Sequence, residues 1–425
     1  MASTYIRKTF STTGTSRQKF TLSMWIKRGS GLGAEQMLCE CYSGSSAKDE
    51  IWLQSNDTIN FVKTDGGGLA TTTSAVFRDT FGWYNLVISA DSTQGSNANR
   101  VKIYINGVQQ TLGQQDTIPQ NANFQFGASG ANLTFGMRNA GDWYFDGSMS
   151  HVHFCDGTAL APTVFGSTDS TTGEWKINTS PSFTPGTNGF TILKDGNTIT
   201  DQSANSNNFS LGGGTLTKTE DSPSNVFATM NVLANFGTQW ALFENGNTYV
   251  RSAGSGEAFI ASTLGIPASS GKFYTEVKYT AGGSESNIGL ASTSFPTSST
   301  DFVGKALNSY SYSQNGEKRF NNNSSSYGNS YAPGDIIGIA VDATNSKLYF
   351  SKNGVFQNSG DPTSGSTGTG AIPISATPTE GFYYMACSKE SGSTKNYYKW
   401  NFGNGFFGTT AVSSAGTNAS GNGIF

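Results

Sequence analysis

The chain has 425 residues and a formal net charge of −3, and only 13% of its residues are charged. It has no basic run and no stretch of 18 apolar residues, which argues against a nucleic-acid-binding or membrane-spanning protein. This length predicts two or three domains, each large enough to bury its own core. Glycine, hydroxyl and amide residues replace charges on such a surface, as is typical of extracellular or virion β-proteins.

Residues 1–165 show short alternating runs separated by turn residues, with no helical periodicity. Strands are expected at Phe20–Lys27, Glu50–Gln54, Thr58–Lys63, Asn132–Gly136 and His151–Phe154. Cys39 and Cys41 alternate on another expected strand. We predict that the four cysteines are free thiols, because they are too few and too scattered to crosslink the chain. Strands at this spacing predict a β-sandwich or jelly roll.

Residues 166–230 carry a weaker pattern, broken by prolines and by three consecutive glycines at 212–214. The isolated aromatic residues of this region include Trp175, Phe183, Phe190 and Phe209. A disordered linker would not need them, so we expect an ordered connector that packs on the first sandwich.

Strand patterns resume over residues 231–408, with clean alternation at Gly271–Tyr279. Further strands are expected at Asn287–Ala291 and Gly381–Cys387. The segment Thr409–Phe425 has no charge and is expected to be a tail or a docking strand.

The same three-strand pattern occurs twice, each time with an Asn-Gly turn. The turns are Asn106-Gly107 and Asn353-Gly354, and each lies between alternating apolar runs. Both residue types tolerate the positive φ of tight hairpins. We therefore predict an all-β protein with two tandem antiparallel β-sandwiches of the jelly-roll type, joined by a compact connector.

Several blocks of the first domain resemble the laminin-G-like, concanavalin A-like lectin superfamily. They are Phe20–Ile26, Trp83–Val87, Lys102–Gly107 and Phe145–Ser150. In the second domain Gly334–Gly338, Lys347–Gly354 and Trp400–Gly403 resemble SPRY hallmarks. Both families imply β-sandwiches that bind ligands through rim loops and are not primarily catalytic.

A laminin-G-like domain followed by a SPRY domain resembles structural proteins of marine bacteriophages. This resemblance implies a virion-surface protein, extracellular after host lysis, such as a peripheral fibre tip, knob or appendage. Its expected partners are other virion proteins and a host-surface glycan or protein, with homo-oligomerisation, no nucleic acid and no membrane insertion. The alternative is a capsid or tail decoration protein that binds only neighbouring virion proteins. A polysaccharide-degrading enzyme is a third, weaker alternative.

The candidate ligand-binding residues are aromatic. Trp143 and Tyr144 could stack on sugar CH groups, and alternation predicts that Trp143 shares a side with Phe145. In the second domain Tyr310, Tyr312, Tyr327 and Tyr331 stand among Ser and Asn in expected loops, where tyrosine offers contact area and a hydroxyl. Ordinary packing is the alternative explanation for each of them.

The candidate metal ligands are Asp142, Asp146 and Asp156, because relatives of the first domain often bind calcium at the sandwich rim. Solvated loop carboxylates are the alternative, and we expect no cofactor unless calcium binds there. His151 and His153 are the only histidines, and their spacing on a strand points both rings to one face. A metal site or a polar outer face would explain this pair.

A catalytic role finds little support in the motifs. Residues 403–408 fit G-x-G-x-x-G by letter, but no helix is expected after them, so a final strand and turn explains the match. Glu-x-Asp-x-(x)-Glu, which polysaccharide-cleaving sandwiches carry on one strand, does not occur. We therefore expect a protein that is not an enzyme.

Overall fold

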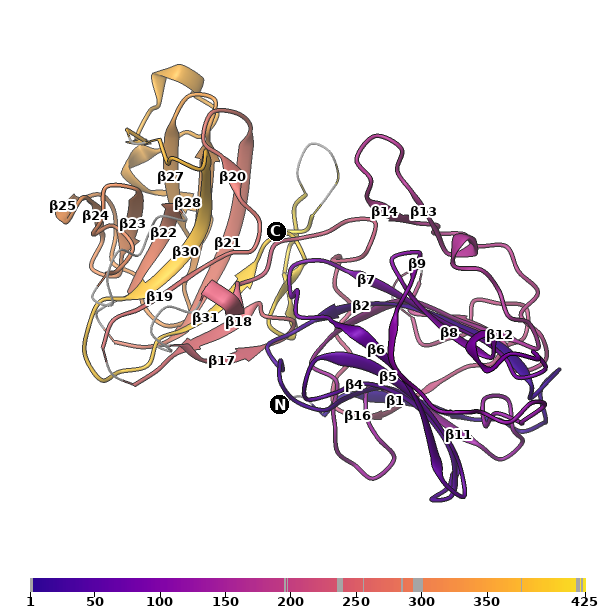
Figure 1. Cartoon of the computed structure of the whole chain (residues 1–425). Coiled ribbons are helices and arrows are strands. Elements are labelled where there is room, and N and C mark those ends of the chain that lie inside the picture. The colour runs from indigo at the N-terminus through magenta and orange to yellow at the C-terminus, as the bar shows by residue number, and fades with distance from the viewer. Residues whose placement is uncertain are drawn as a thin grey trace. The chain divides into compact units, whose positions relative to one another are not determined.

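The computed structural model describes residues 3–194, 196, 198–234, 240–254, 256–283, 286–292, 301–375, 377–417, 421 and 423–425. These residues form strands and short 3-10 turns, with no α-helix among them. Within the same residues, no helix is long and apolar enough to cross a membrane. The chain divides into two compact units, residues 1–226 and residues 227–425 (Figure 1). The predicted all-β class is therefore confirmed.

The first unit contains two antiparallel sheets. The larger sheet consists, in spatial order, of β10 (Leu112–Gln115), β6 (Gly68–Val76), β5 (Thr58–Asp65), β4 (Ala47–Leu53), β3 (Gln36–Gly44), β11 (Asn132–Phe135), β1 (Tyr5–Thr9) and β16 (Ser210–Gly213). The smaller consists of β15 (Phe190–Ile192), β12 (Gly147–Asp156), β2 (Lys19–Arg28), β7 (Tyr84–Asp91), β8 (Val101–Ile105) and β9 (Val108–Gln109). Strands β13 (Gly166–Thr168) and β14 (Trp175–Ile177) form a separate ribbon.

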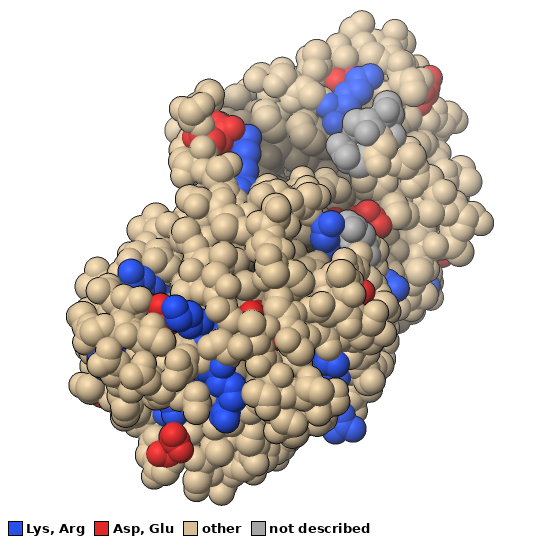
Figure 2. All heavy atoms as spheres, turned by 90° about the vertical axis from the view of Figure 1, so that its right-hand side faces the viewer, with Lys and Arg blue, Asp and Glu red and all other residues tan. Residues whose placement is uncertain are grey.

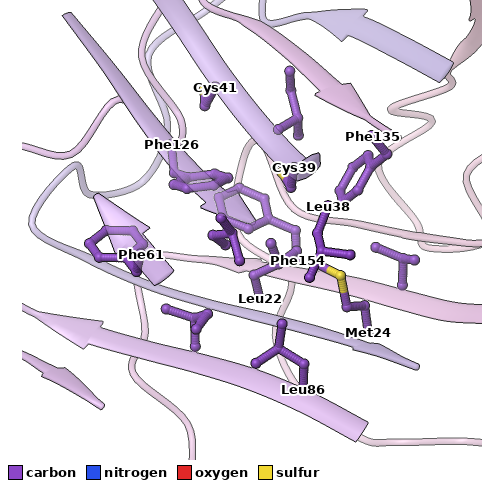
Figure 3. Packing of buried hydrophobic residues seen from close by; sticks show 14 of the residues in the cluster. Leu22, Met24, Leu38, Cys39, Cys41, Phe61, Leu86, Phe126, Phe135 and Phe154 are labelled. Atoms are coloured by element: carbon purple, nitrogen blue, oxygen red, sulfur yellow. The ribbon is translucent and has the colours of Figure 1, made fainter. Parts of the chain in front are cut away.

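The core of the first unit contains apolar side chains from both sheets. Leu22 on β2, Phe61 on β5 and Phe154 on β12 belong to one cluster and are fully buried (Figure 3). Each such burial contributes roughly 1.5–3 kcal/mol. Cys39 and Cys41 belong to this cluster as free thiols, and burial raises the pKa of both well above the usual range. The prediction of buried free thiols is confirmed, since Cys155 and Cys387 are also free and buried.

The segment after residue 165 is built into the first unit. It supplies an edge strand to each sheet, because β15 pairs with β12 and β16 pairs with β1. The indole Nε1 of Trp175 donates to Asn85 Oδ1 on β7 at 3.2 Å. Phe190 and Phe209 lie in the sandwich core with their rings 4.8 Å apart. The isolated aromatic residues of this segment thus contact the sandwich.

The second unit also contains two antiparallel sheets. The first consists of β17 (Trp240–Glu244), β18 (Tyr249–Ser252), β31 (Tyr397–Asn401), β21 (Lys272–Ala281), β26 (Ile336–Asp342), β27 (Lys347–Lys352) and β28 (Val355–Phe356), with β29 (Ile372–Pro373) also on β27. The other consists of β19 (Ala258–Ala261), β30 (Phe382–Lys389), β22 (Ser286–Ser292), β23 (Ser309–Ser313), β24 (Glu317–Phe320) and β25 (Asn323–Ser326), with β20 (Ile266–Pro267) also on β30. Strands β32 (Phe406–Phe407) and β33 (Thr410–Ala411) form a short ribbon.

The two predicted hairpins form in both units by the same local chemistry. Asn106 and Gly107 have φ of 49° and 77°, and Asn353 and Gly354 have φ of 50° and 79°. Each asparagine side chain also accepts a hydrogen bond from the first strand of its three-strand unit. The donors are Asn85 N–H of β7 at 2.8 Å and Ile336 N–H of β26 at 2.9 Å. These turns fix the register of β7–β8–β9 and β26–β27–β28, so the predicted repeat is confirmed.

Candidate functional site

The first unit contains a cavity of about 350 Å³ beside strand β12. His153 of β12 and Thr191 of β15 form one wall. The remaining lining residues lie before and after β15 in the chain: Ser180, Pro181, Phe183, Pro185, Lys194, Gln202, Ser203 and Ala204. Ligand pockets commonly have volumes of about 300–1,000 Å³ and combine apolar walls with a few polar groups. This cavity is therefore the candidate binding site.

Strand β12 is distorted where it meets the cavity. Its register with β2 shifts between Ser150 and His153, as in a β-bulge. His151 has φ of 46°, and Leu193 has φ of 56°. The N–H of His151 donates to the carbonyl of Leu193 at 2.8 Å. Bulges and left-handed non-glycine residues often accompany functional sites, where they aim a side chain. Here the bulge directly precedes His153.

The imidazole of His153 is 2% exposed and has one hydrogen-bonded nitrogen. Its Nδ1 lies 3.0 Å from Thr191 Oγ1. The ring stacks on Phe165 with centroids 5.7 Å apart and meets Phe183 edge-on at 5.9 Å. No hydrogen bond to Nε2 is found among the residues that the structure describes. His153 is itself one of the lining residues of the cavity.

His153 is a neutral side chain in the folded protein. Burial lowers its pKa from 6.5 to about 3, and the charges of His151 and Lys194 act in the same direction. A neutral imidazole has one donor and one acceptor nitrogen. The cavity therefore presents a hydrogen-bonding ring without a positive charge on it.

The outer wall of the cavity is fixed by Asp201, which is 8% exposed. Its Oδ1 accepts bonds from Thr191 N–H at 2.9 Å and Ser203 N–H at 2.8 Å. Its Oδ2 accepts bonds from Ser203 Oγ at 2.8 Å and Asn207 N–H at 2.7 Å. Because one carboxylate ties the loop to β15, the polar groups of the wall are positioned before any ligand arrives.

The two histidines share a face, as predicted, without a third metal-ligating side chain grouped with them in the described part of the chain. Val152 and Phe154 point into the core, while the rings of His151 and His153 lie on the opposite side, 6.4 Å apart. His151 Nδ1 lies 2.7 Å from Ser150 Oγ. Within the described ranges, no three His, Cys, Asp or Glu side chains are grouped to hold a metal ion. The connector covers this face, so it is not the exposed polar face that the sequence also allowed.

The three predicted metal ligands lie in separate hydrogen-bonding environments. Asp142 forms an ion pair with Arg138 through both carboxylate oxygens. Asp156 is 2% exposed, and its Oδ2 accepts bonds from Thr15 N–H at 2.6 Å and Asn188 N–H at 3.0 Å. These carboxylates join loops of the protein, and the structure does not bring them together as one ligand set.

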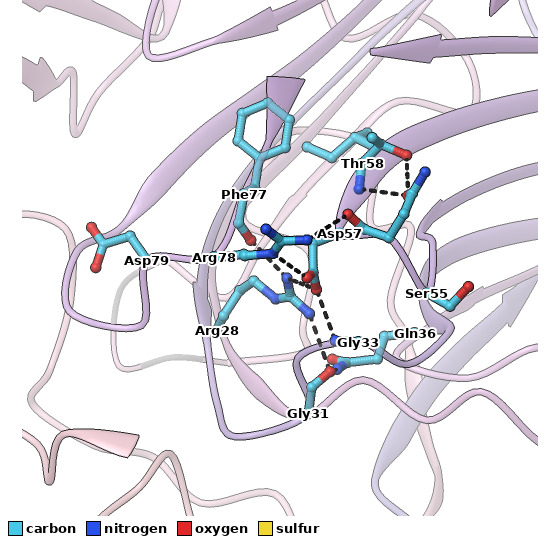
Figure 4. Close-up of polar contacts among 12 residues, drawn as sticks. Arg28, Gly31, Gly33, Gln36, Ser55, Asp57, Thr58, Phe77, Arg78 and Asp79 are labelled. Carbon is cyan, nitrogen blue, oxygen red and sulfur yellow. Dashed lines mark hydrogen bonds and ion pairs between the residues drawn. The ribbon is translucent and has the colours of Figure 1, made fainter. Parts of the chain in front are cut away.

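Asp146, the third predicted ligand, organises the loop that precedes β3. Its Oδ2 accepts bonds from Ser30 Oγ and Gly31 N–H, both at 2.9 Å. Arg28 also contacts this loop, because its Nη2 donates to Gly31 O at 3.2 Å while its Nη1 lies 2.8 Å from Asp57 Oδ1 (Figure 4). Hydrogen bonds within the protein thus support this rim loop.

Trp143 lies outside any strand, and its packing contradicts the expected alternation. Its φ is 52°, so the chain turns there and sends Trp143 and Phe145 to different places. Phe145 packs against the sandwich core, whereas Trp143 contacts Trp52 with ring centroids 5.8 Å apart. Arg138 lies 4.0 Å from the Trp143 ring centroid. One face of the indole is therefore covered, and Tyr144 beside it is half-buried.

The four candidate tyrosines of the second unit are core residues. Tyr310 and Tyr312 lie on β23 and are fully buried, while Tyr327 and Tyr331 are 5% and 2% exposed. Tyr310 and Tyr312 lie on a strand and not in the expected loop, and alternation in Ser-Tyr-Ser-Tyr-Ser sends both rings into the core. Tyr327 and Tyr331 lie outside strands, as expected, but are buried. Tyr312 packs on Phe350 at 5.5 Å. Ligand binding by these residues stays a prediction, and their burial leaves little surface for it.

Comparison with known proteins defines the class of each unit. Residues 2–165 match the model of the concanavalin A-like lectin/glucanases superfamily, and residues 272–374 match the model of the SPRY domain. Both are β-sandwich families that generally serve as binding modules. The chain thus carries a concanavalin A-like domain followed by a SPRY domain. No curated protein matches the sequence.

Three solved structures show similarity to parts of this chain. The SPRY domain of human HERC1 is 15% identical, with 39% of this chain and 96% of that chain covered and a TM-score of 0.31. The native heptameric SAP-like pentraxin from Limulus polyphemus is 14% identical, with 38% and 72% covered and a TM-score of 0.29. A human SPRY domain is 15% identical, with 38% and 94% covered and a TM-score of 0.28.

Sequence reasoning missed the residues of the outer wall. Lys194, Gln202 and Ser203 line the cavity but lie in the segment that was expected only to connect. Phe183 was one of its isolated aromatic residues, and a ligand wall is one reason for such a residue. The histidine pair was the other sequence signal for this site, because the β-bulge lies at these residues and His153 lines the cavity.

Proposed function

We propose that this chain is a non-catalytic recognition protein of a bacteriophage particle and that it binds a host-surface glycan or receptor. The observation that carries the proposal is the cavity of about 350 Å³, where a buried imidazole and several hydroxyl and amide groups meet aromatic and proline side chains. Both families are generally binding modules, which supports recognition rather than turnover. The domain order supports a place on the virion surface.

The surface chemistry of the chain supports recognition of a polar ligand. The face shown in Figure 2 consists mostly of uncharged residues with scattered Lys, Arg, Asp and Glu. Uncharged hydroxyl and amide groups exchange hydrogen bonds with glycans without the salt sensitivity of charged contacts. Single contacts of this kind are weak, so homo-oligomers or many copies on a particle would raise the effective concentration of sites.

Binding of the fluorescent full-length chain to intact marine bacterial cells tests this function. We expect saturable binding that is displaced by a glycan, with the chain presented as an oligomer to restore avidity. Binding to no cell would contradict the adhesin role. Release of sugar from polysaccharide, lost on changing one carboxylate, would instead identify an enzyme.

A decoration role within the virion is the second candidate, and the end of the chain favours it. The N–H of Ile424 donates to Gly403 O at 2.8 Å, and Asn401 Nδ2 donates to Ile424 O at 2.8 Å. The Phe425 ring lies 5.2 Å from that of Tyr274. This docked end fits the ordered tail expected of a decoration protein. Incorporation into particles that resists high salt, together with indifference to glycans, would support this role.

A further inference from the structure

Most polar groups among the described lining residues of the cavity are uncharged. Thr191 and Ser203 carry hydroxyls, Gln202 carries an amide, and His153 carries a neutral imidazole. The only charged side chain among the described lining residues is Lys194. The described wall therefore suits a ligand that exchanges neutral hydrogen bonds.

Most of the other lining residues are apolar. Phe183 supplies an aromatic ring, and Pro181, Pro185 and Ala204 supply aliphatic surface. A pyranose ring has the matching character, since its CH groups form apolar patches while its hydroxyls point outward. Few other small ligands combine an apolar face with a ring of hydroxyls in this volume.

The buried histidine favours a hydroxyl over an anion. Either Thr191 Oγ1 donates to Nδ1 of His153, or Nδ1 donates to Thr191, and the two cases make Nε2 a donor or an acceptor. A sugar hydroxyl can satisfy Nε2 in both cases, because it donates and accepts. A carboxylate only accepts, so it fits one tautomer and gains no attraction from a neutral ring.

The cavity extends beyond the region shared with the lectin superfamily. The family match ends at residue 165, whereas every lining residue except His153 lies between Ser180 and Ala204. The wall is held by Asp201, which joins it to β15. We infer that this cavity receives one uncharged sugar residue of a larger glycan, an inference that rests on the proposed recognition function.

Saturation-transfer NMR with the full-length chain tests the inference. The probes are glucose, galactose, mannose and N-acetylglucosamine, compared with glucuronate, N-acetylneuraminate and inorganic phosphate. We expect transfer to at least one neutral sugar and at least tenfold weaker transfer to the acidic probes. Ala204→Trp, at the exposed edge of the cavity, should abolish the transfer. Ala98→Trp is the matched control, because Ala98 is exposed and does not line the cavity. This variant should retain the transfer.

Ser180→Trp provides a second blocking variant if Ala204→Trp lowers the thermal midpoint, since Ser180 is also exposed and lines the cavity. Three results would overturn the inference: preference for an acidic probe, transfer that survives both blocking variants, or no transfer from any neutral sugar at about 100 mM. Cell binding that survives both blocking variants would overturn the sugar site and leave the recognition function standing. Failure of the unmodified chain to bind any cell would overturn the recognition function itself.

Discussion

The ammonium group of Lys27 lies 2.8 Å from the carboxylate of Asp221, although the two residues are 194 positions apart. Lys27 lies on β2 of the smaller sheet, and its side chain is only 4% exposed. Trp83 Nε1 donates to the other Asp221 oxygen at 3.2 Å. The end of the connector is therefore fastened to the sandwich through a buried charge.

Replacing Asp221 should destabilise the first unit. Asp221→Ala removes the carboxylate that faces Lys27, and loss of one partner of a buried pair typically costs about 3–5 kcal/mol. Urea unfolding followed by tryptophan fluorescence measures this change. Lys176→Met is the control, because its pair with Asp169 is more exposed and should contribute much less to stability than the buried pair. Equal effects of the two variants would contradict a structural role for the buried pair.

His153 should not titrate between pH 5 and pH 8. Its pKa is lowered to about 3 by burial, so the ring stays neutral throughout this range in the folded state. The chain has only two histidines, and ring-proton NMR of a His151→Gln variant assigns the signals of His153 directly. A midpoint near 6.5 would show that the ring is solvated and that the connector does not cover it.

Glu40 should make the first unit less stable as the pH rises. Burial, together with Glu50 on the neighbouring strand, raises the Glu40 pKa from 4.5 to about 7. The folded state thus holds a proton that the unfolded state releases at lower pH. The resulting stabilisation is complete below about pH 4.5 and is lost as the pH rises through about 7.

Glu40→Gln should remove this dependence, because an amide cannot release the proton. Relative to the unmodified chain, the variant should gain on the order of 1 kcal/mol between pH 5 and pH 8. Urea midpoints at the two pH values measure the gain. Burial also raises the pKa of Asp49 to about 7. Because Asp49 is present in both proteins, its contribution to the difference between them cancels. Glu174→Gln at an exposed position should leave the pH dependence unchanged.

Tyr312 should act as a core residue of the second unit. Tyr312→Ala should cost about 3–5 kcal/mol, as large-to-small core changes do, because the ring packs on Phe350 and Tyr327. Tyr312→Phe removes the hydroxyl that donates to Asn329 O and should cost about 1 kcal/mol. Calorimetry of the thermal unfolding of the second unit checks both values. Tyr397→Phe is the control, because Tyr397 is half-buried. Unchanged stability with lost ligand binding would restore the original prediction for this residue.

Calcium should not stabilise the first unit. Asp146 and Asp156 already accept hydrogen bonds from backbone N–H groups, and Asp142 is paired with Arg138. We expect thermal midpoints within about 1 °C in EDTA and in excess calcium, since a ligand stabilises only by binding the folded state. Asp156→Ala should lower the midpoint equally in both buffers. A calcium-dependent rise that Asp156→Ala or Asp146→Ala abolishes would establish the metal site.

The strands and the repeated hairpin were predictable because their causes are local. Period-2 alternation defines which face of a strand is buried, and Asn106-Gly107 supplies the positive φ that a tight turn needs. The same alternation failed at Trp143, where a left-handed residue interrupts it. Sequence gives little warning of such a residue when it is not glycine or asparagine.

By itself, the sequence determined the all-β class, the two sandwiches, the free thiols and the histidine pair on one face. Only the tertiary structure decided that Asp146 and Asp156 bind loop amides, that Tyr310 and Tyr312 are buried, and that His153 lines a cavity. The physical reason is the sequence separation of the residues that interact. Alternation and turns act over a few residues, whereas the cavity and the hydrogen bonds of these carboxylates depend on segments that meet only when the chain has folded.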